Sequence, residues 1–523
     1  MQIKRTTKMT QRSLLKKIIN TIFTLLFILT PLIAGILLCA VDGKTLSDIY
    51  IPLGGWSDEI TYYKQIEGML SHGIPRGYFG FDQSQAKYGP FGYWGILPLI
   101  PYVIWGFFFG WTYISPIYAN ICFCSLAFLF IYFLLKPQKK WCLSFSLFWI
   151  SFQFLNRHVL SGASEATLIL PLVIVVILGE YLLSDKVEKI INLDKKKENW
   201  FILICNIIVF FMTVVRPYYA VFYLVTFWAA IKRKKKREIF ITPIVALMSI
   251  ACFFLYKEYF CAAYFDDVIL WEEMLADGIA GIFKEIAVDT IQILKFIWYS
   301  IRYKDVPGWY YLFLFVELGL MFIACITKAI KHKKIPSMYI VALVGNALIV
   351  LSIMLLYSLV VGGRHIIPLI VMNAVLLLME THISIGWLLA CIGISCSLLA
   401  GVREPLPYEE KEYAEWLDEL EATFAEYMEV TDSLSYDNVV ATIVSGSSKE
   451  DPNREAVTYY GYLYAVPAGM GVSLDNWDMY EDLDNIKAKY IIAHPDAKVR
   501  DQLDAKGMKC VLEMEELVLY IRE

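Results

Sequence analysis

Residues 90–111 read PFGYWGILPLIPYVIWGFFFGW, and this stretch decides how the chain is threaded through a membrane. It is apolar and long enough to cross a hydrocarbon core of about 30 Å. It also contains three prolines, which break helices, and many aromatic residues, which prefer the membrane interface. We therefore predict a broken element that lies at the outer interface, or dips into it, rather than a crossing.

The composition is that of a polytopic membrane protein. The 523 residues are 58% hydrophobic, with a mean hydropathy of +0.53, and a soluble chain of this size would expose too much apolar surface. The first long apolar run, residues 18–40, follows a series of lysines and arginines and lacks a cleavage site of small residues. We expect an uncleaved anchor whose N-terminus lies in the cytoplasm.

Four basic clusters orient the spans, because positive charge in short loops stays in the cytoplasm. They lie at residues 136–140, 186–197, 232–237 and 328–334. A crossing at residues 90–111 would put the first cluster outside, whereas an interfacial element leaves all four inside. The predicted spans are about eleven: 18–40, 113–135, 141–158, 164–183, 201–215, 218–231, 238–256, 309–329, 337–359, 366–381 and 384–402. This topology leaves residues 41–112 and 257–308 as outer loops, and an amphipathic run at residues 268–301 suits the membrane surface.

The chain divides into two units of opposite charge. Residues 403–523 hold 27 acidic and 11 basic residues, a net charge of −16, and the remainder of the 51 acidic and 47 basic residues gives residues 1–402 a charge of +12. The first unit is the predicted membrane domain, and the second is a predicted extracytoplasmic α/β domain. Its expected helices are residues 408–429, 476–486 and 496–506, and its expected strands are 438–444, 489–493 and 510–522. The Gly-rich residues 461–474 lack a GxGxxG pattern, so we predict no nucleotide site.

Asp58 and Glu59 form an acidic pair in the first outer loop, within GGWSDEITYYKQIEGMLSHG. Either Ser57 or Asp58 can cap the helix that follows, which is one explanation of the pair. The other is a general base, which takes the proton of an attacking hydroxyl. Spacing alone does not decide between them.

Arginines at the predicted outer ends of later spans favour the second explanation. Arg157, Arg216 and Arg364, the last followed by His365, all fall on the side where positive charge is depleted. Arginine offers forked donors to phosphate, so a phosphate site is one interpretation; packing or interface anchoring is the other. Lys87 is a further candidate for the same phosphate.

Other polar residues carry weaker signals. Asp266, Asp267, Glu272 and Glu273 suit a solvated helix face, or a divalent cation shared with Asp58 or Glu59. Glu165 suits a favourable charge in the first turn of a helix. Trp56, Tyr62, Tyr63 and Tyr88 are candidates for contact with a sugar. The eleven cysteines form neither a disulfide framework nor a zinc pattern.

The series WSDEITYYKQIEGMLSHG, QAKYGPFGYWGILPL, NRHVLSGASEATLIL, TVVRPYYAVFYL and VGGRHIIPLIV resembles the GT-C superfamily of membrane glycosyltransferases. Within it, the motifs are most similar to the protein O-mannosyltransferase and lipid A aminoarabinose transferase group. The resemblance covers residues 15–402 and implies juxtamembrane helices, an acidic motif at Asp58 and Glu59, and donors on polyprenyl or dolichyl phosphate. It also matches Lys87, Arg216-Pro217 and Arg364 to Pro368, with His365 where an aromatic residue is usual.

These observations predict an inverting glycosyltransferase of a bacterial plasma membrane. Asp58 would act as the base with Glu59 assisting, and Lys87, Arg157, Arg216, Arg364 and His365 would bind the donor phosphate. The expected partners are a polyprenyl-phosphate-linked sugar, membrane lipids and an outer acceptor that is a glycan, lipid or protein; no nucleic acid is expected. No cofactor is required, although a divalent cation is compatible with the acids. The rival hypotheses are a transporter or flippase of a lipid-linked glycan, and an inactive assembly partner.

Overall fold

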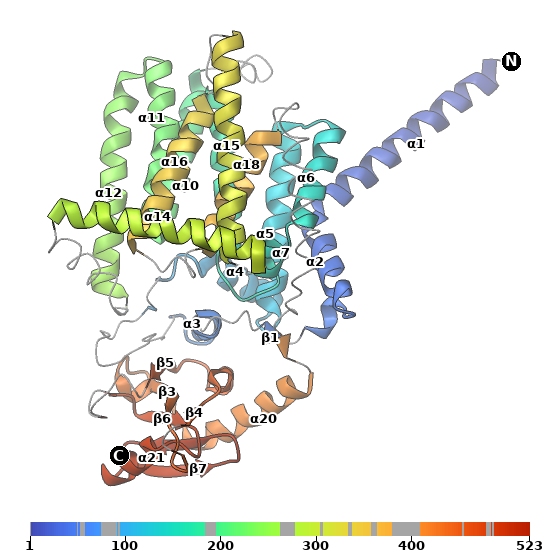
Figure 1. The fold of residues 1–523 in the computed structure, drawn as a ribbon. Coiled ribbons are helices and arrows are strands. Elements are labelled where there is room, and N and C mark those ends of the chain that lie inside the picture. The colour runs from blue at the N-terminus through green and yellow to red at the C-terminus, as the bar shows by residue number, and fades with distance from the viewer. Residues whose placement is uncertain are drawn as a thin grey trace.

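The protein consists of a helical bundle with a small mixed α/β domain at one end (Figure 1). The computed structural model describes residues 2–49, 51–52, 58–74, 91–92, 95–183, 195–261, 278–303, 307–332, 337–356, 363–378, 408–409, 411–451, 454–476, 483 and 486–523. The predicted span at residues 384–402 lies outside these ranges. So do most of the predicted helix at residues 476–486 and the acids Asp266, Asp267, Glu272 and Glu273.

Six helices in the described ranges are long and apolar enough to cross a membrane. They are α5 (Ser115–Phe130) with its π-helical extension η2 (Ile131–Leu135), α8 (Ala166–Leu183), α10 (Lys195–Val215), α12 (Lys236–Phe260), α15 (Pro307–His332) and α16 (Ser337–Leu356). Each coincides with a predicted span. A seventh crossing is formed if α1 (Gln2–Ile28) and α2 (Thr30–Val41), bent by 63° relative to each other, make one span. The predicted total of about eleven stays a prediction.

Several predicted spans are broken rather than continuous. The predicted first span, residues 18–40, bends at Leu29, just before Pro31. Residues 141–158 form α6 (Lys139–Ser151) and α7 (Gln153–Val159), separated at the non-helical Phe152. Residues 218–231 begin as the 3-10 turn η3 (Pro217–Phe222) and continue as α11 (Tyr223–Lys232). Residues 366–381 likewise begin in η4 (Gly363–Ile366), and α18 (Ile367–Leu378) follows with every residue buried.

The stretch at residues 90–111 is not a continuous helix. Its only described helix is α4 (Ile100–Phe109), which has 10 residues and ends at Gly110. A helix of this length rises about 15 Å, half of a hydrocarbon core. Phe107, Phe108 and Phe109 are exposed along it. The prediction that this stretch is broken is confirmed, and its place at the outer interface stays a prediction.

The helix α8 links two chemically different ends of the bundle. It starts directly after Glu165, and the carbonyl of Leu183 at its other end accepts a hydrogen bond from Lys232. Arg233 beside it pairs with Glu198. Since 18 helical residues rise about 27 Å, the basic turn at residues 232–237 lies a membrane thickness away from Glu165.

A polar network lies inside the bundle. Asn373 of α18 donates to Glu317 of α15 at 3.2 Å, and it exchanges hydrogen bonds with Asn346 of α16 at 2.9 and 3.2 Å. All three side chains are fully buried. Polar groups in an apolar interior need such partners, so this network fixes how α18 is rotated against its neighbours.

The helix α14 (Gly278–Tyr303) runs crosswise to the spanning helices (Figure 1). It begins inside the amphipathic run predicted at residues 268–301. Its exposed side chains include Ile279, Phe283, Ile291 and Leu294. A crosswise amphipathic helix suits the surface of a bilayer, with its apolar side chains in the lipid.

Gly308, at the start of α15, allows α14 and α15 to pack in contact. A Cβ atom at this position would lie far inside van der Waals contact with the carbonyl oxygen of Phe296, and close to Ser300 Oγ at 2.5 Å. Backbone atoms cannot yield as a side chain does, so Gly308→Ala should destabilise the protein by about 1–3 kcal/mol. Thermal unfolding in detergent measures this, with Gly319→Ala, which meets no atom within 4 Å, as the control. An unchanged midpoint for Gly308→Ala would contradict the packing.

The C-terminal domain is built on a six-stranded sheet. The strand order is β4 (Glu455–Val457), β3 (Val439–Ser447), β6 (Tyr490–Ala493), β8 (Val518–Ile521) and β7 (Lys509–Glu513), and β5 (Gly471–Asn476) also pairs with β3. The pairs β3–β5 and β3–β6 are parallel, and the others are antiparallel. Helices α20 (Lys411–Tyr427) and α21 (Val499–Ala505) confirm two predicted helices. The prediction of one strand at residues 510–522 is wrong, because these residues belong to the hairpin β7–β8.

The helix α3 (Asp58–His72) lies between the bundle and the C-terminal domain (Figure 1). Tyr62 and Ile66 pack against Tyr102 of α4 and its neighbours. Ile60 and Tyr63 belong to the apolar core of the C-terminal domain. A two-residue ladder between β1 (Ile51–Pro52) and β2 (Tyr408–Glu409) joins the domains beside it.

Candidate active site

Asp58, the first residue of α3, forms an ion pair with Arg364 of η4. The carboxylate oxygen Oδ2 accepts a hydrogen bond from Nη2 at 2.6 Å. The Arg364 side chain is 7% exposed and that of Asp58 is 18% exposed, so the carboxylate lies on the solvent side of the pair. A charge-assisted hydrogen bond of this length is a strong one.

Glu165 lies on the buried side of the same arginine. Its Oε1 is 3.4 Å from Nε of Arg364, 3.9 Å from Nη2 of Arg216 and 3.9 Å from Nδ1 of His365. The Glu165 side chain is 3% exposed. We call Asp58, Glu165, Arg216, Arg364 and His365 the ion-pair cluster. It joins α3 to the ends of three segments of the bundle.

Local sequence explains how the arginines reach this position. Pro217 has no N–H and cannot continue α10, so Arg216 is extended, with φ −143° and ψ 114°, and its side chain turns inward to 3% exposure. Arg364 likewise sits in a 3-10 turn before α18. A break at the end of each helix thus presents a cation at the same place.

Gly162 brings the loop before α8 against α3. A Cβ atom at Gly162 would lie 3.0 Å from Cβ of Glu59 and 3.3 Å from its Cγ. The Glu59 side chain is buried. Burial raises the pKa of Tyr464 well above its ordinary value, and the charge of Glu59 adds to this effect. Glu59 therefore faces the C-terminal domain.

The acidic and basic side chains of the ion-pair cluster balance in charge. Burial lowers the pKa of His365 well below its ordinary value, and the charges of Arg216 and Arg364 add to this, so the ring is neutral. Two carboxylates, Asp58 and Glu165, then face two guanidinium groups, Arg216 and Arg364. Charges this deeply buried interact strongly, because little water screens them.

The structure brings several predicted site residues together and places others elsewhere. Asp58, Arg216, Arg364 and His365 lie in the ion-pair cluster. Tyr62 lies near it: burial raises the pKa of the Tyr62 hydroxyl well above its ordinary value, and the charge of Asp58 adds to this effect. Arg157 lies on α7, half-buried, beside His158. Trp56, Lys87 and Tyr88 are outside the described residues.

Tyr63 packs on the other face of α3. Its ring stacks on those of Trp111 and Tyr113 at centroid distances of 5.5 and 5.6 Å, and meets Tyr464 edge-on at 5.2 Å. It is 6% exposed. These contacts make Tyr63 part of the docking surface for the C-terminal domain.

Sequence reasoning missed the role of Glu165. It interpreted the residue as a first-turn charge, which fits its place before α8, but the side chain also pairs with two arginines. The available signal was its position at the same predicted outer boundary as Arg216 and Arg364. An acid among cations on one face is a candidate counter-ion.

Lys64 ties α3 to the C-terminal domain. Its buried Nζ donates to the carbonyl oxygens of Val466 and, at 3.4 Å, Tyr464, and it pairs with Glu67 one turn along the helix. The ring of His72 also lies against Gly469. The helix that carries Asp58 is therefore held by a domain that lies 400 residues further along the chain.

Lys64→Met should loosen the C-terminal domain from α3. Methionine fills the space but donates no hydrogen bond, which leaves buried carbonyls unsatisfied at a cost of about 1–3 kcal/mol. Limited proteolysis should release the C-terminal domain faster than in Lys411→Met, where the lysine is 59% exposed and pairs with Glu415 on the surface of α20. Equal release rates for the two variants would contradict this role of Lys64.

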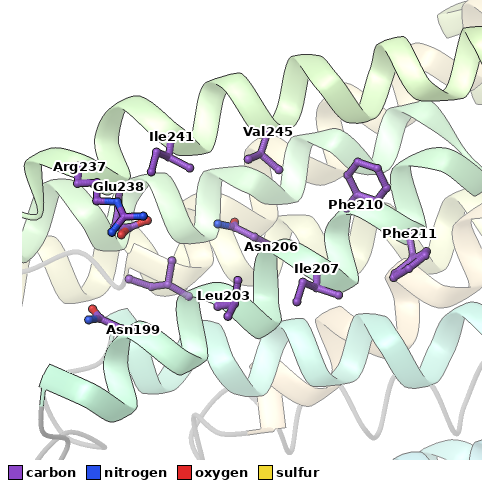
Figure 2. Close-up of a pocket in the computed structure, with 11 residues that line it drawn as sticks. Asn199, Leu203, Asn206, Ile207, Phe210, Phe211, Arg237, Glu238, Ile241 and Val245 are labelled. Atoms are coloured by element: carbon purple, nitrogen blue, oxygen red, sulfur yellow. The ribbon is translucent and has the colours of Figure 1, made fainter.

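A cavity of about 650 Å³ lies between α10 and α12 (Figure 2), and no residue of the ion-pair cluster lines it. Asn199, Arg237 and Glu238 line its polar end, and Asn206 lies among aliphatic and phenylalanine side chains that line the rest. Arg237 borders the basic turn at the far end of α8. This cavity therefore does not serve the chemistry of Asp58.

No metal-binding group is evident in the described ranges. None of their His, Cys, Asp and Glu side chains gather in a set of three or more that could hold a metal ion. The predicted metal partners of Asp58 at residues 266–273 are outside these ranges.

Comparisons with known proteins give a structural likeness without a sequence match. No protein-family model matches the chain, and no curated protein matches it in sequence. The crystal structure of ArnT from Cupriavidus metallidurans in the apo state is similar over 96% of this chain and 98% of that chain, with 10% sequence identity and a TM-score of 0.39. This is a likeness of overall arrangement alone.

Proposed function

We propose that this protein is a membrane glycosyltransferase that moves a sugar from a polyprenyl-phosphate donor to an acceptor outside the cytoplasm. The observation that carries the proposal is the ion-pair cluster, in which the partly exposed carboxylate of Asp58 and the arginines Arg216 and Arg364 meet at one end of the spanning helices. A base beside cations is what transfer from a phosphate requires.

The reaction would proceed by direct displacement. The acceptor hydroxyl oxygen attacks the anomeric carbon while Asp58 takes its proton, and the bond between that carbon and the donor phosphate oxygen breaks. The phosphate leaves with the bonding electrons, and its charge is stabilised by Arg364 and Arg216. Attack opposite the leaving group inverts the anomeric centre. The phosphate is already a good leaving group, so one carboxylate suffices.

The remaining predicted residues have supporting roles in this proposal. Lys87, Arg157 and His365 would complete the donor site, Glu59 would assist Asp58, and Trp56, Tyr62 and Tyr88 would contact the substrates. Residues 1–402 would form the membrane domain of a plasma-membrane protein with a cytoplasmic N-terminus. Residues 403–523 would form an outer domain that covers the acceptor side of α3.

The position of the basic turns supports this orientation. The turn at residues 232–237 lies at the end of α8 opposite Glu165, and positive charge favours the cytoplasmic side. The ion-pair cluster would then face outward, where lipid-linked sugars meet their acceptors.

A reconstituted assay tests the proposal. The purified full-length protein is placed in liposomes with undecaprenyl-phosphate hexose or aminopentose and a bacterial glycolipid extract, and mass spectrometry follows the release of undecaprenyl phosphate. We expect release that depends on both protein and extract. Movement of the headgroup across the bilayer with the sugar–phosphate bond intact would instead establish the flippase and overturn the transferase.

A further inference from the structure

We propose that Asp58 occupies the place of the donor phosphate on Arg364 when the site is empty, and that donor binding displaces it and frees it to act as the base. This inference rests on the proposed function and adds an order of events to it. Its physical basis is that a carboxylate and a phosphate compete for the same guanidinium donors.

The charges around Arg364 make competition unavoidable. Asp58 accepts from Nη2 at 2.6 Å, and Glu165 lies 3.4 Å from Nε, so two oxyanions already occupy this guanidinium group. Asp58 and Glu165 already balance the charges of Arg364 and Arg216. A phosphate that entered beside both carboxylates would meet repulsion in a poorly screened site.

The difference in burial between the two carboxylates determines which of them leaves Arg364. Glu165 is 3% exposed and lies between Arg364 and Arg216, whereas Asp58 is 18% exposed and contacts Arg364 from the solvent side. Asp58 is also the first residue of α3, where one rotation of its side chain moves the carboxylate away. A phosphate that approaches from outside therefore exchanges with Asp58, while Glu165 continues to hold the arginines.

The exchange would couple binding of the donor to activation of the base. While Asp58 is bonded to Arg364, one of its oxygens is engaged as an acceptor. Once the phosphate takes over Arg364, that oxygen can receive the proton of an acceptor hydroxyl. The base is thus released only when a donor is present to react.

Binding of a donor fragment tests the displacement without turnover. Undecaprenyl phosphate carries no sugar to transfer, and its affinity for the full-length protein in nanodiscs is measured by native mass spectrometry. Asp58→Asn and Asp58→Ser both retain a helix-capping group but remove the competing charge. We expect each to bind the lipid phosphate about three- to tenfold more tightly than the wild type.

A charge-matched control separates local from general effects. Glu415→Gln removes one negative charge from a 59% exposed position on α20 and should leave the affinity unchanged. Equal or weaker binding by both Asp58 variants overturns the displacement, as does the same gain in Glu415→Gln. Absence of binding by the wild type and by both Asp58 variants would instead contradict a polyprenyl-phosphate sugar as the donor in the proposed function.

Discussion

Asp58→Asn should lower the rate of sugar transfer by about 10²–10⁴-fold, the usual contribution of a positioned general base. Asparagine preserves the size of the side chain and can still begin α3, but it cannot take a proton from the acceptor hydroxyl. The loss should therefore appear in kcat. If Asp58 also competes with the donor, KM for the donor should fall at the same time.

Steady-state transfer by wild type, Asp58→Asn and Glu415→Gln measures this effect. Glu415 lies on an exposed face of α20, so Glu415→Gln should transfer at the wild-type rate. Asp58→Asn with near wild-type kcat would exclude Asp58 as the base. Attention would then turn to Glu59, the adjacent buried carboxylate.

Arg364→Leu should remove transfer and destabilise the protein together. Leucine leaves Asp58 and Glu165 without their shared cation, and the loss of one partner from a buried ion pair costs about 3–5 kcal/mol. Arg364→Leu also removes the hydrogen-bond donors that stabilise the leaving phosphate, and this should lower the transfer rate by a further factor of about 10²–10³. Thermal unfolding in detergent and transfer rates report the two effects separately.

Two companion variants distinguish charge from geometry. Arg364→Lys retains the charge but not the forked donors, so it should recover much of the stability and little of the transfer. Glu165→Gln combined with Arg364→Leu should recover stability without transfer, because it removes one unpaired buried charge. Transfer by Arg364→Leu at the wild-type rate would contradict a role for this arginine in donor binding.

Features of the fold that depend on local sequence were predicted, whereas features that depend on contacts between distant residues were harder to predict. Long apolar helices such as α8 and α16 were predictable because each span carries its own hydropathy signal. The broken element at residues 90–111 was predictable from its prolines. The break at Phe152 was harder to predict, since Phe152 is non-helical in a tightly packed aromatic environment and no local helix breaker marks it.

The ion-pair cluster was predictable in part. Arg216 and Arg364 stood out because cations are rare at outer helix ends, and Asp58 because an acid heads a helix in an outer loop. Which of them meet depends on bundle packing, and nothing local indicates that Glu165 lies between the arginines. Lys64 gave no signal at all, because its carbonyl partners belong to a domain far along the chain.

The distances along the chain between site partners have a consequence for biosynthesis. Asp58 and Arg364 are 306 residues apart, and α3 receives its second support from residues 464–466. Chains fold from the N-terminus as they are made, so α3 reaches the membrane surface long before either partner exists. An unfinished or truncated chain would insert its first helices and yet present no assembled charge cluster. The charge cluster and the support of α3 would thus be assembled only after residues 464–466 have been made.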